Sequence, residues 1–175
     1  MSMLLFLLSV SQVNPQIQSI NPYPTFQMML DSAKIVIIAK VDSMWFTGDE
    51  HSMPRTHYLA ELLALYTRSD SFPVPRGTVH IVEEGGIGSD GRAYFDSGEA
   101  SYDLGEVFLA AIREYHWKLS DTEVIFTTTS NAWKYTITND SIRLAFGPYG
   151  FEPKTLSIAE VICALSSHFN KKAEK

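Results

Sequence analysis

The segment that most constrains the fold is residues 34–47, KIVIIAKVDSMWFT, because it is apolar on two faces. It is rich in β-branched residues, and aliphatic positions alternate with charged ones, which predicts a long β-strand. Val36 and Ile38 lie on the face opposite the main aliphatic row, so something must also cover that side of the strand, and flanking helices are the obvious candidates. The main row is Ile35, Ile37, Ala39 and Val41, and the charged residues between and beside them are Lys34, Lys40 and Asp42.

Several further segments are predicted to be short β-strands separated by turn residues. They lie at 78–84, 107–114, 124–128, 133–137 and 141–146, with a tight hairpin turn at Asn139-Asp140. Residues 57–68, HYLAELLALYTR, are ambiguous, since Ala, Leu and Glu favour a helix while apolar residues also alternate as in a strand. Before the first strand, Thr25 is expected to cap a short helix with the apolar stripe Phe26, Met29, Leu30 and Ala33.

A C-terminal helix over 157–170 is the best determined element. Ser157 and Glu160 stand at the spacing of a capping box, in which each side chain bonds the other residue's backbone N–H. Leu156 and Val161 take the positions of a hydrophobic staple around it. The helix is expected to dock on the domain through one stripe, made of Ile158, Val161, Ile162, Leu165 and Phe169.

The first residues predict export. Residues 3–10 form an apolar run of signal-peptide length, too short to span a bilayer as a helix, and Ser9 and Ser11 place small residues ahead of a cleavage point. A positive n-region is missing, so residues 1–11 are interpreted as a truncated signal segment, with a buried apolar segment as the alternative. The proline-rich residues 12–24 form a linker. Residues 25–175 then form a single domain.

Composition narrows the classes of partner. The chain carries 20 acidic and 14 basic residues, for a net charge of −6, and lacks the clustered basic footprint of a nucleic-acid binder. Cys163 is the single cysteine, so an intrachain disulfide is excluded. The five histidines are dispersed, and no metal-ligand spacing occurs. We therefore expect no cofactor and no metal, and we assign no catalytic residue.

Four local patterns suggest chemistry but have plainer explanations. Gly86-x-Gly88-x-x-Gly91 matches a dinucleotide-binding pattern by letters, but no helix is expected to follow it, so a loop between strands is favoured. His57 with Glu61 could line a site, although a satisfied or exposed histidine is the default. The acid pairs Glu83-Glu84 and Glu99 with Asp103 are expected to be solvated on turns, and Cys163 to be a buried, inert thiol.

Together these elements resemble a netrin-like domain, the OB-type barrel of the tissue inhibitors of metalloproteinases. The resemblance covers residues 25–145 and rests on the short helix, the strand in 32–46, the Gly85-Gly86 loop and the step from Gly105-Glu106 into Val107-Phe108-Leu109. It implies a mostly β fold: a five- to six-stranded OB-like barrel with a short N-terminal helix and a C-terminal capping helix. It also decides the ambiguous segment, and 56–67 is predicted to be a strand antiparallel to 34–47.

The resemblance transfers no functional residue. The inhibitors use an N-terminal cysteine and several disulfides, and this chain has only Cys163. The expected function is a non-enzymatic extracytoplasmic binding or adaptor module for an unknown protein or surface ligand. The alternatives are an enzyme with a dispersed, motif-free site and a nucleic-acid-binding OB domain, which the charge disfavours. Clustered exposed aromatic residues would favour the first, a concave pocket of perturbed acids the second and a basic groove the third.

Export predicts a processed N-terminus. In its own host, the mature protein should begin near Gln12, because cleavage is expected after Ser11. Mass spectrometry of the purified protein measures this directly. An intact Met1 on protein recovered from the soluble cytoplasmic fraction would contradict it.

Overall fold

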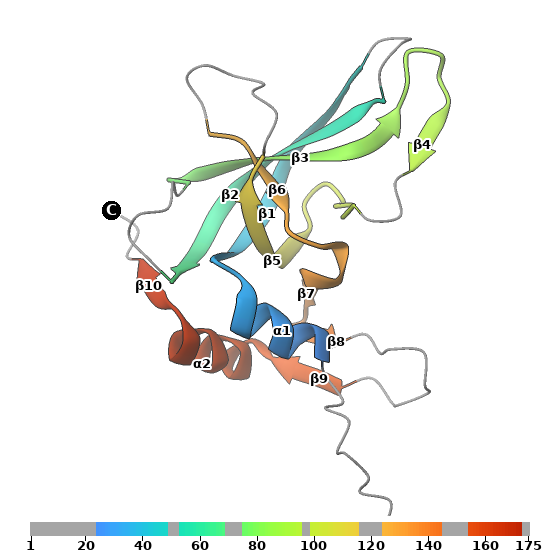
Figure 1. Cartoon of the computed structure of the whole chain (residues 1–175). Coiled ribbons are helices and arrows are strands. Elements are labelled where there is room, and N and C mark those ends of the chain that lie inside the picture. The colour runs from blue at the N-terminus through green and yellow to red at the C-terminus, as the bar shows by residue number, and fades with distance from the viewer. Residues whose placement is uncertain are drawn as a thin grey trace, which may run out of the picture.

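Five strands close into an OB-like barrel. The computed structural model describes residues 24–48, 53–68, 75–95, 99–115, 124–144 and 154–172. Around the barrel the order is β1-β2-β3-β6-β5, and β5 pairs again with β1 (Figure 1). Neighbouring strands are antiparallel except β3 and β6, which are parallel. The strands are β1 (Ile35–Thr47), β2 (Arg55–Thr67), β3 (Thr78–Ile87), β5 (Val107–Glu114) and β6 (Phe126–Thr128). The predicted fold class is confirmed.

Strand β1 holds the barrel together. Residues 35–40 pair with β2 on one side and with β5 on the other, so the strand has no free edge there. The predicted strand at 56–67 is confirmed as β2, antiparallel to β1 throughout. The main aliphatic row of β1 faces the barrel interior, where it packs with residues such as Ile81 and Phe108. The alternation in the sequence therefore correctly predicted which side chains of β1 face the barrel interior.

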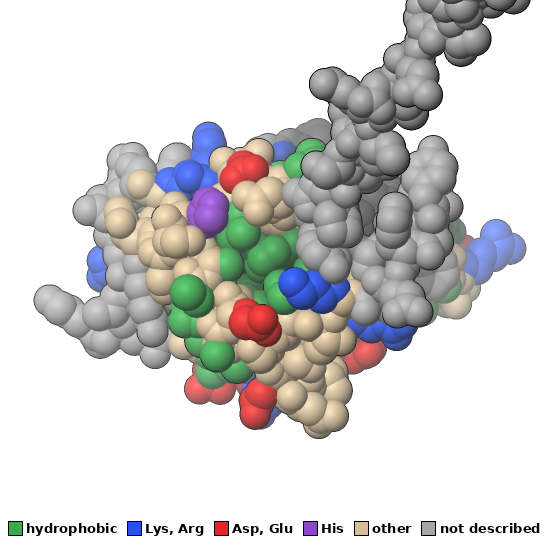
Figure 2. All heavy atoms as spheres, turned by 90° about the horizontal axis from the view of Figure 1, so that it is seen from below, with side chains coloured by type: hydrophobic (Ala, Val, Ile, Leu, Met, Phe, Trp, Pro, Cys, Tyr) green, Lys and Arg blue, Asp and Glu red, His purple; other side chains and the backbone are tan. Residues whose placement is uncertain are grey.

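The opposite face of β1 belongs to a second core. Val36 and Ile38 pack there with residues of two helices and a small sheet, as the sequence predicted for a strand that is apolar on both faces. These elements are α1 (Pro24–Ser32), β7 (Lys134–Thr138), β8 (Ser141–Leu144), β9 (Lys154–Ser157) and α2 (Ile158–His168), and they lie together on one side of the barrel (Figure 1). Seen from that side, apolar side chains gather near the centre of the surface (Figure 2).

Helix α2 begins as predicted and ends earlier. Ser157 is its N-cap, and the capping box with Glu160 is present. The helix ends at His168, two residues before the predicted limit, because Phe169 takes an extended conformation with φ −132°. The chain then forms β10 (Asn170–Lys172), which pairs with the end of β2. Within the stripe, Val161 and Leu165 are fully buried.

Arg68 joins three of these elements at the end of β2. Its guanidinium donates hydrogen bonds to the carbonyl oxygens of Leu30 and Ala33, at the C-terminus of α1. The same group lies 4.7 Å from the centre of the Phe169 ring. A cation at a helix C-terminus also compensates the helix dipole. Arg68 therefore fixes α1 and the end of α2 against the barrel.

The remaining local predictions agree closely with the structure. The predicted short helix is present as α1, but it begins at Pro24, so Thr25 lies within the helix and is not its N-cap. Asn139 and Asp140 both have positive φ, 49° and 54°, as a tight hairpin turn of the I′ type requires. A short 3-10 helix, η1 (Asn131–Trp133), precedes β7. The predicted signal segment 1–11 and residues 12–23 of the predicted linker 12–24 lie outside the described residues, as do 145–146 of the predicted strand 141–146. Pro24, assigned to the linker, is instead the first residue of α1.

One part of the sheet extends beyond the barrel. Past Lys40, β1 pairs with β2 but no longer with β5. The β2 residues that pair with this part of β1 also pair with β3 on their other side. The short strand β4 (Ala93–Phe95) adds to the end of β3. We call this part the projecting sheet, consisting of 43–47, 55–59, 80–87 and 93–95; it extends away from the helices (Figure 1). Among the described residues, no helix has the length and apolar character needed to cross a membrane.

Leu165→Ala should lower the free energy of unfolding by about 2–5 kcal/mol, because it leaves a cavity in the second core. Ile162→Ala is the matched control on the same helix, where the side chain is 37% exposed, and should cost less than about 1 kcal/mol. Urea unfolding of both variants measures the difference. Equal effects would mean that α2 does not dock through the described face.

Candidate binding surface on the projecting sheet

The projecting sheet has two faces, set by the alternation of side chains along its strands. Tyr58 and Ile81 point into the barrel core, and the face that continues theirs is called the inner face. The face carrying His57 and His80, the residues next to them in sequence, is called the outer face. Met44 pairs with Tyr58 and therefore belongs to the inner face, whereas Trp45 pairs with His57 on the outer one.

The inner face presents apolar side chains to solvent. Met44 is 41% exposed, Phe46 43% and Tyr94 38%. Tyr94 belongs to this face because it pairs with Gly86, where a Cβ would point at Phe46. The two rings sit on glycines: a Cβ at Gly86 would lie 2.7 Å from Cδ1 of Phe46, and one at Gly88 would lie 2.8 Å from Cε2 of Tyr94. Any larger residue at these glycines would push the rings away. The glycines thus set the positions of two exposed aromatic rings.

Exposed apolar residues concentrate in this region. Eleven large apolar side chains are exposed in the described part of the chain, and six of them lie on the projecting sheet or beside it. A cluster of this kind on a soluble surface is typical of an interaction site, whereas single exposed apolar residues are ordinary. The six are Met44, Phe46, Met53, Ile87 and Tyr94, together with Trp45 on the outer face.

The outer face carries a group of three rings. Trp45 stacks on His57 with ring centres 5.0 Å apart and an angle of 14° between the planes. The Nδ1 of His57 lies 3.0 Å from Nε2 of His80, and Thr47 Oγ1 lies 2.6 Å from Nε2 of His57. Both ring nitrogens of His57 therefore have partners. We call His57 and His80 the imidazole pair.

His57 is neutral at physiological pH. Its pKa is lowered from 6.5 to about 4, mainly because burial disfavours the charged ring and also because His80 and Arg55 repel a positive charge there. The sequence pointed to His57 together with Glu61, but these two residues stand four apart on one strand, and Glu61 pairs with Lys40 and Thr78 instead. The partner of His57 is His80, 23 residues away in the chain.

Glu83 is buried, contrary to the prediction from the sequence. It was expected on a solvated turn, but it is 2% exposed, because β3 continues past it and carries its side chain into the barrel. Thr127 Oγ1 donates to its carboxyl group over 2.9 Å and the Thr128 N–H over 2.8 Å, and the Thr128 hydroxyl donates as well. The hydroxyls of Tyr102 and Thr128 form a further hydrogen bond.

Burial controls the protonation of Glu83. Its pKa is raised from 4.5 to about 9, first by loss of solvation and then by a hydrogen bond with Glu99, while the bonds from Thr128 and Thr127 act in the other direction. The carboxyl group is therefore protonated at neutral pH. A group buried in this way cannot reach a substrate. Its hydrogen bonds join β3 to β6, which share one residue pair, Ile81 with Phe126, within the described ranges.

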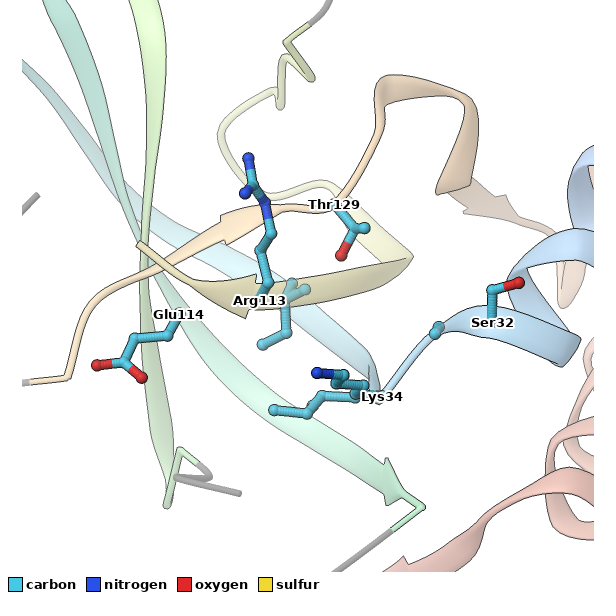
Figure 3. Close-up of a pocket in the computed structure, with 8 residues that line it drawn as sticks. Ser32, Lys34, Arg113, Glu114 and Thr129 are labelled. Atoms are coloured by element: carbon cyan, nitrogen blue, oxygen red, sulfur yellow. The ribbon is translucent and has the colours of Figure 1, made fainter. Parts of the chain in front are cut away.

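A cavity of about 380 Å³ lies at the other end of β1 (Figure 3). The buried residues Ile35 and Ile112 line it together with Thr129. Lys34 lies across it, while the charged ends of Arg113 and Glu114 point away from one another (Figure 3). The perturbed acid Glu83 does not line this cavity, so the cavity and the unusual carboxyl group are separate features.

Two further sequence observations are resolved by the fold. Gly86 lies within β3, opposite Tyr94, whereas Gly88 and Gly91 lie in the turn between β3 and β4. A strand rather than a helix follows Gly91. Cys163 was expected to be buried, but it is exposed, because α2 packs through Val161 and Leu165 on another side. In the described ranges, no group of three or more His, Cys, Asp or Glu side chains could hold a metal ion.

Comparison with known proteins adds no relative. No family model matches the chain, and searches of the curated proteins and of the solved structures give no match either.

Glu83 should make stability depend on pH. Its pKa is about 9 when folded against 4.5 as the unperturbed value, so the folded state holds the extra proton, and the free energy of unfolding should fall as pH rises through this window. Glu83→Gln, which resembles the protonated form, should gain stability relative to the native chain as pH rises from about 5 to about 9. Glu84→Gln is the neighbouring control. Parallel pH profiles for the native chain and Glu83→Gln would contradict this assignment.

Proposed function

We propose that this chain is a non-enzymatic binding module that holds a protein ligand on the inner face of its projecting sheet. The observation that carries the proposal is the presence of Met44, Phe46 and Tyr94 on that face, each about two-fifths exposed. Methionine and aromatic side chains are enriched at the centre of protein interfaces. Their exposure in the free protein leaves apolar area for a partner to cover.

The surface is preorganised for this purpose. Phe46 and Tyr94 rest on Gly86 and Gly88, and the hydroxyl of Tyr94 donates to Asp90 over 3.0 Å. On β2, Thr56 donates to the Gly85 carbonyl over 2.8 Å, which joins the strands beneath the rings. Rings that are already held in place lose little conformational entropy on binding. The methionine can adapt its shape to the partner.

The proposal places the module outside the cytoplasm and in a netrin-like lineage. The apolar run 3–10 with Ser9 and Ser11 supports export. An OB-like barrel with a helix on either side of it in sequence is consistent with the resemblance noted in residues 25–145. The lone cysteine separates this chain from the inhibitors that act through an N-terminal cysteine. A binding role without that chemistry fits both observations.

The two alternatives receive less support. An enzyme would need its perturbed acid in a concave site, and Glu83 is sealed inside the barrel, away from the described cavity. A nucleic-acid module would need a basic groove beside the aromatic residues, and the net charge is −6. Exposed apolar and aromatic residues are the feature that favours the binding module.

A photo-crosslinking experiment tests the proposal. A benzophenone amino acid at Phe46 should give one saturable protein adduct in the native host's envelope fraction, because that position lies within the proposed interface. The control is the same substitution at Leu63, which is 44% exposed near the far end of β2. Unlabelled native chain should compete for the adduct, and Met44→Ala/Tyr94→Ala should compete at least tenfold more weakly. Equal competition by both, or equal adducts from Phe46 and Leu63, would overturn the proposal.

A further inference from the structure

We propose that the imidazole pair, His57 and His80, binds a divalent copper ion on the outer face of the projecting sheet. This site is separate from the protein-binding inner face and does not depend on it. The two nitrogens that face one another come from different strands and lie 3.0 Å apart. The register of β2 against β3, with Leu59 opposite His80, sets this approach.

The separation of the nitrogens selects the metal. Imidazole nitrogens bind such ions at about 2.0–2.1 Å, so two of them at right angles around one ion lie about 2.9 Å apart, and at the tetrahedral angle about 3.3 Å. The observed 3.0 Å is closer to the right-angled arrangement, which belongs to the tetragonal ions Cu²⁺ and Ni²⁺. Copper binds such ligands more tightly than nickel or zinc. For both nitrogens to bind the ion at this separation, His80 carries its proton on Nδ1, so that Nε2 offers its lone pair.

The neighbours of His57 prepare it as a ligand. Thr47 Oγ1 lies 2.6 Å from Nε2, so in the tautomer with its proton on Nε2 the ring donates to Thr47 and turns the lone pair of Nδ1 towards His80. A hydrogen bond of this kind is the usual support for a metal-bound histidine.

Trp45 completes the site without binding the ion. Its ring centre lies 5.0 Å from that of His57 and 5.2 Å from that of His80, so it covers one side of the pair. Two protein ligands leave coordination positions open to water or to a group brought by a second molecule. Because the indole is in contact with both rings, bound Cu²⁺ should quench its fluorescence.

The experiment titrates the full chain, carrying no affinity tag, with CuCl₂ near neutral pH. Tryptophan fluorescence should fall and level off at one equivalent of copper, and the electron paramagnetic resonance spectrum should show coupling to two nitrogens. His80→Gln, at the half-buried position, should weaken binding at least tenfold, as should His57→Gln. Thr47→Val should weaken it about tenfold. Trp45→Phe should lose most of the quenching but keep the two-nitrogen spectrum.

His168→Gln is the matched control, because His168 lies on α2, outside the projecting sheet, and it should bind copper like the native chain. Circular dichroism of each variant shows whether it is folded, and His80→Gln carries the test if His57→Gln is not. Unchanged affinity in a folded His80→Gln variant, or no saturation at one equivalent in the native chain, would overturn the copper site. Neither result alters the crosslinking outcome at Phe46, so the two proposals fail separately.

Discussion

The fold depends on β1 being enclosed on every side over residues 35–40. Hydrogen bonds to β2 and β5 satisfy its backbone, its inner row fills the barrel, and Val36 and Ile38 hold the second core. A central strand that is apolar on both faces is unusual in a mainly antiparallel sheet, where one face commonly meets water. It requires a second layer of structure, which α1, α2 and the β7–β9 sheet supply.

The same strand also creates the candidate binding surface by leaving the barrel. The register of β1 against β2 shifts between Val41 and Ser43, and near that point Val41 exchanges backbone hydrogen bonds with Gly105 and Glu106 instead of with β5. Bulges of this kind increase twist and redirect a strand. The residues beyond it carry both faces proposed for binding, one for a protein and one for copper. Stability and recognition are thus assigned to different halves of one strand.

The predictions from the sequence succeeded where a local pattern determines the structure and failed where strand register does. The alternation in β1, the capping box of Ser157 and the turn at Asn139-Asp140 depend on neighbours in the chain, and all three are present. The burial of Glu83 and the approach of His57 to His80 depend on how β3 meets β6 and β2. No spacing within one segment reveals such contacts. Alternation along both strands marks residues that share a face, but the register that makes them neighbours comes from the folded sheet.

The position of α1 and β10 determines how the molecule would sit on a support. Both lie near the start of β1 and the end of β2, whereas the projecting sheet lies at the opposite ends of these 13-residue strands. At roughly 3.3 Å per residue, the projecting sheet begins about 26 Å from the start of β1 and ends about 40 Å from it. Attachment through a segment that precedes α1 or follows β10 would therefore place the projecting sheet at the end of the molecule farther from the point of attachment, with the barrel as a spacer between them (Figure 1).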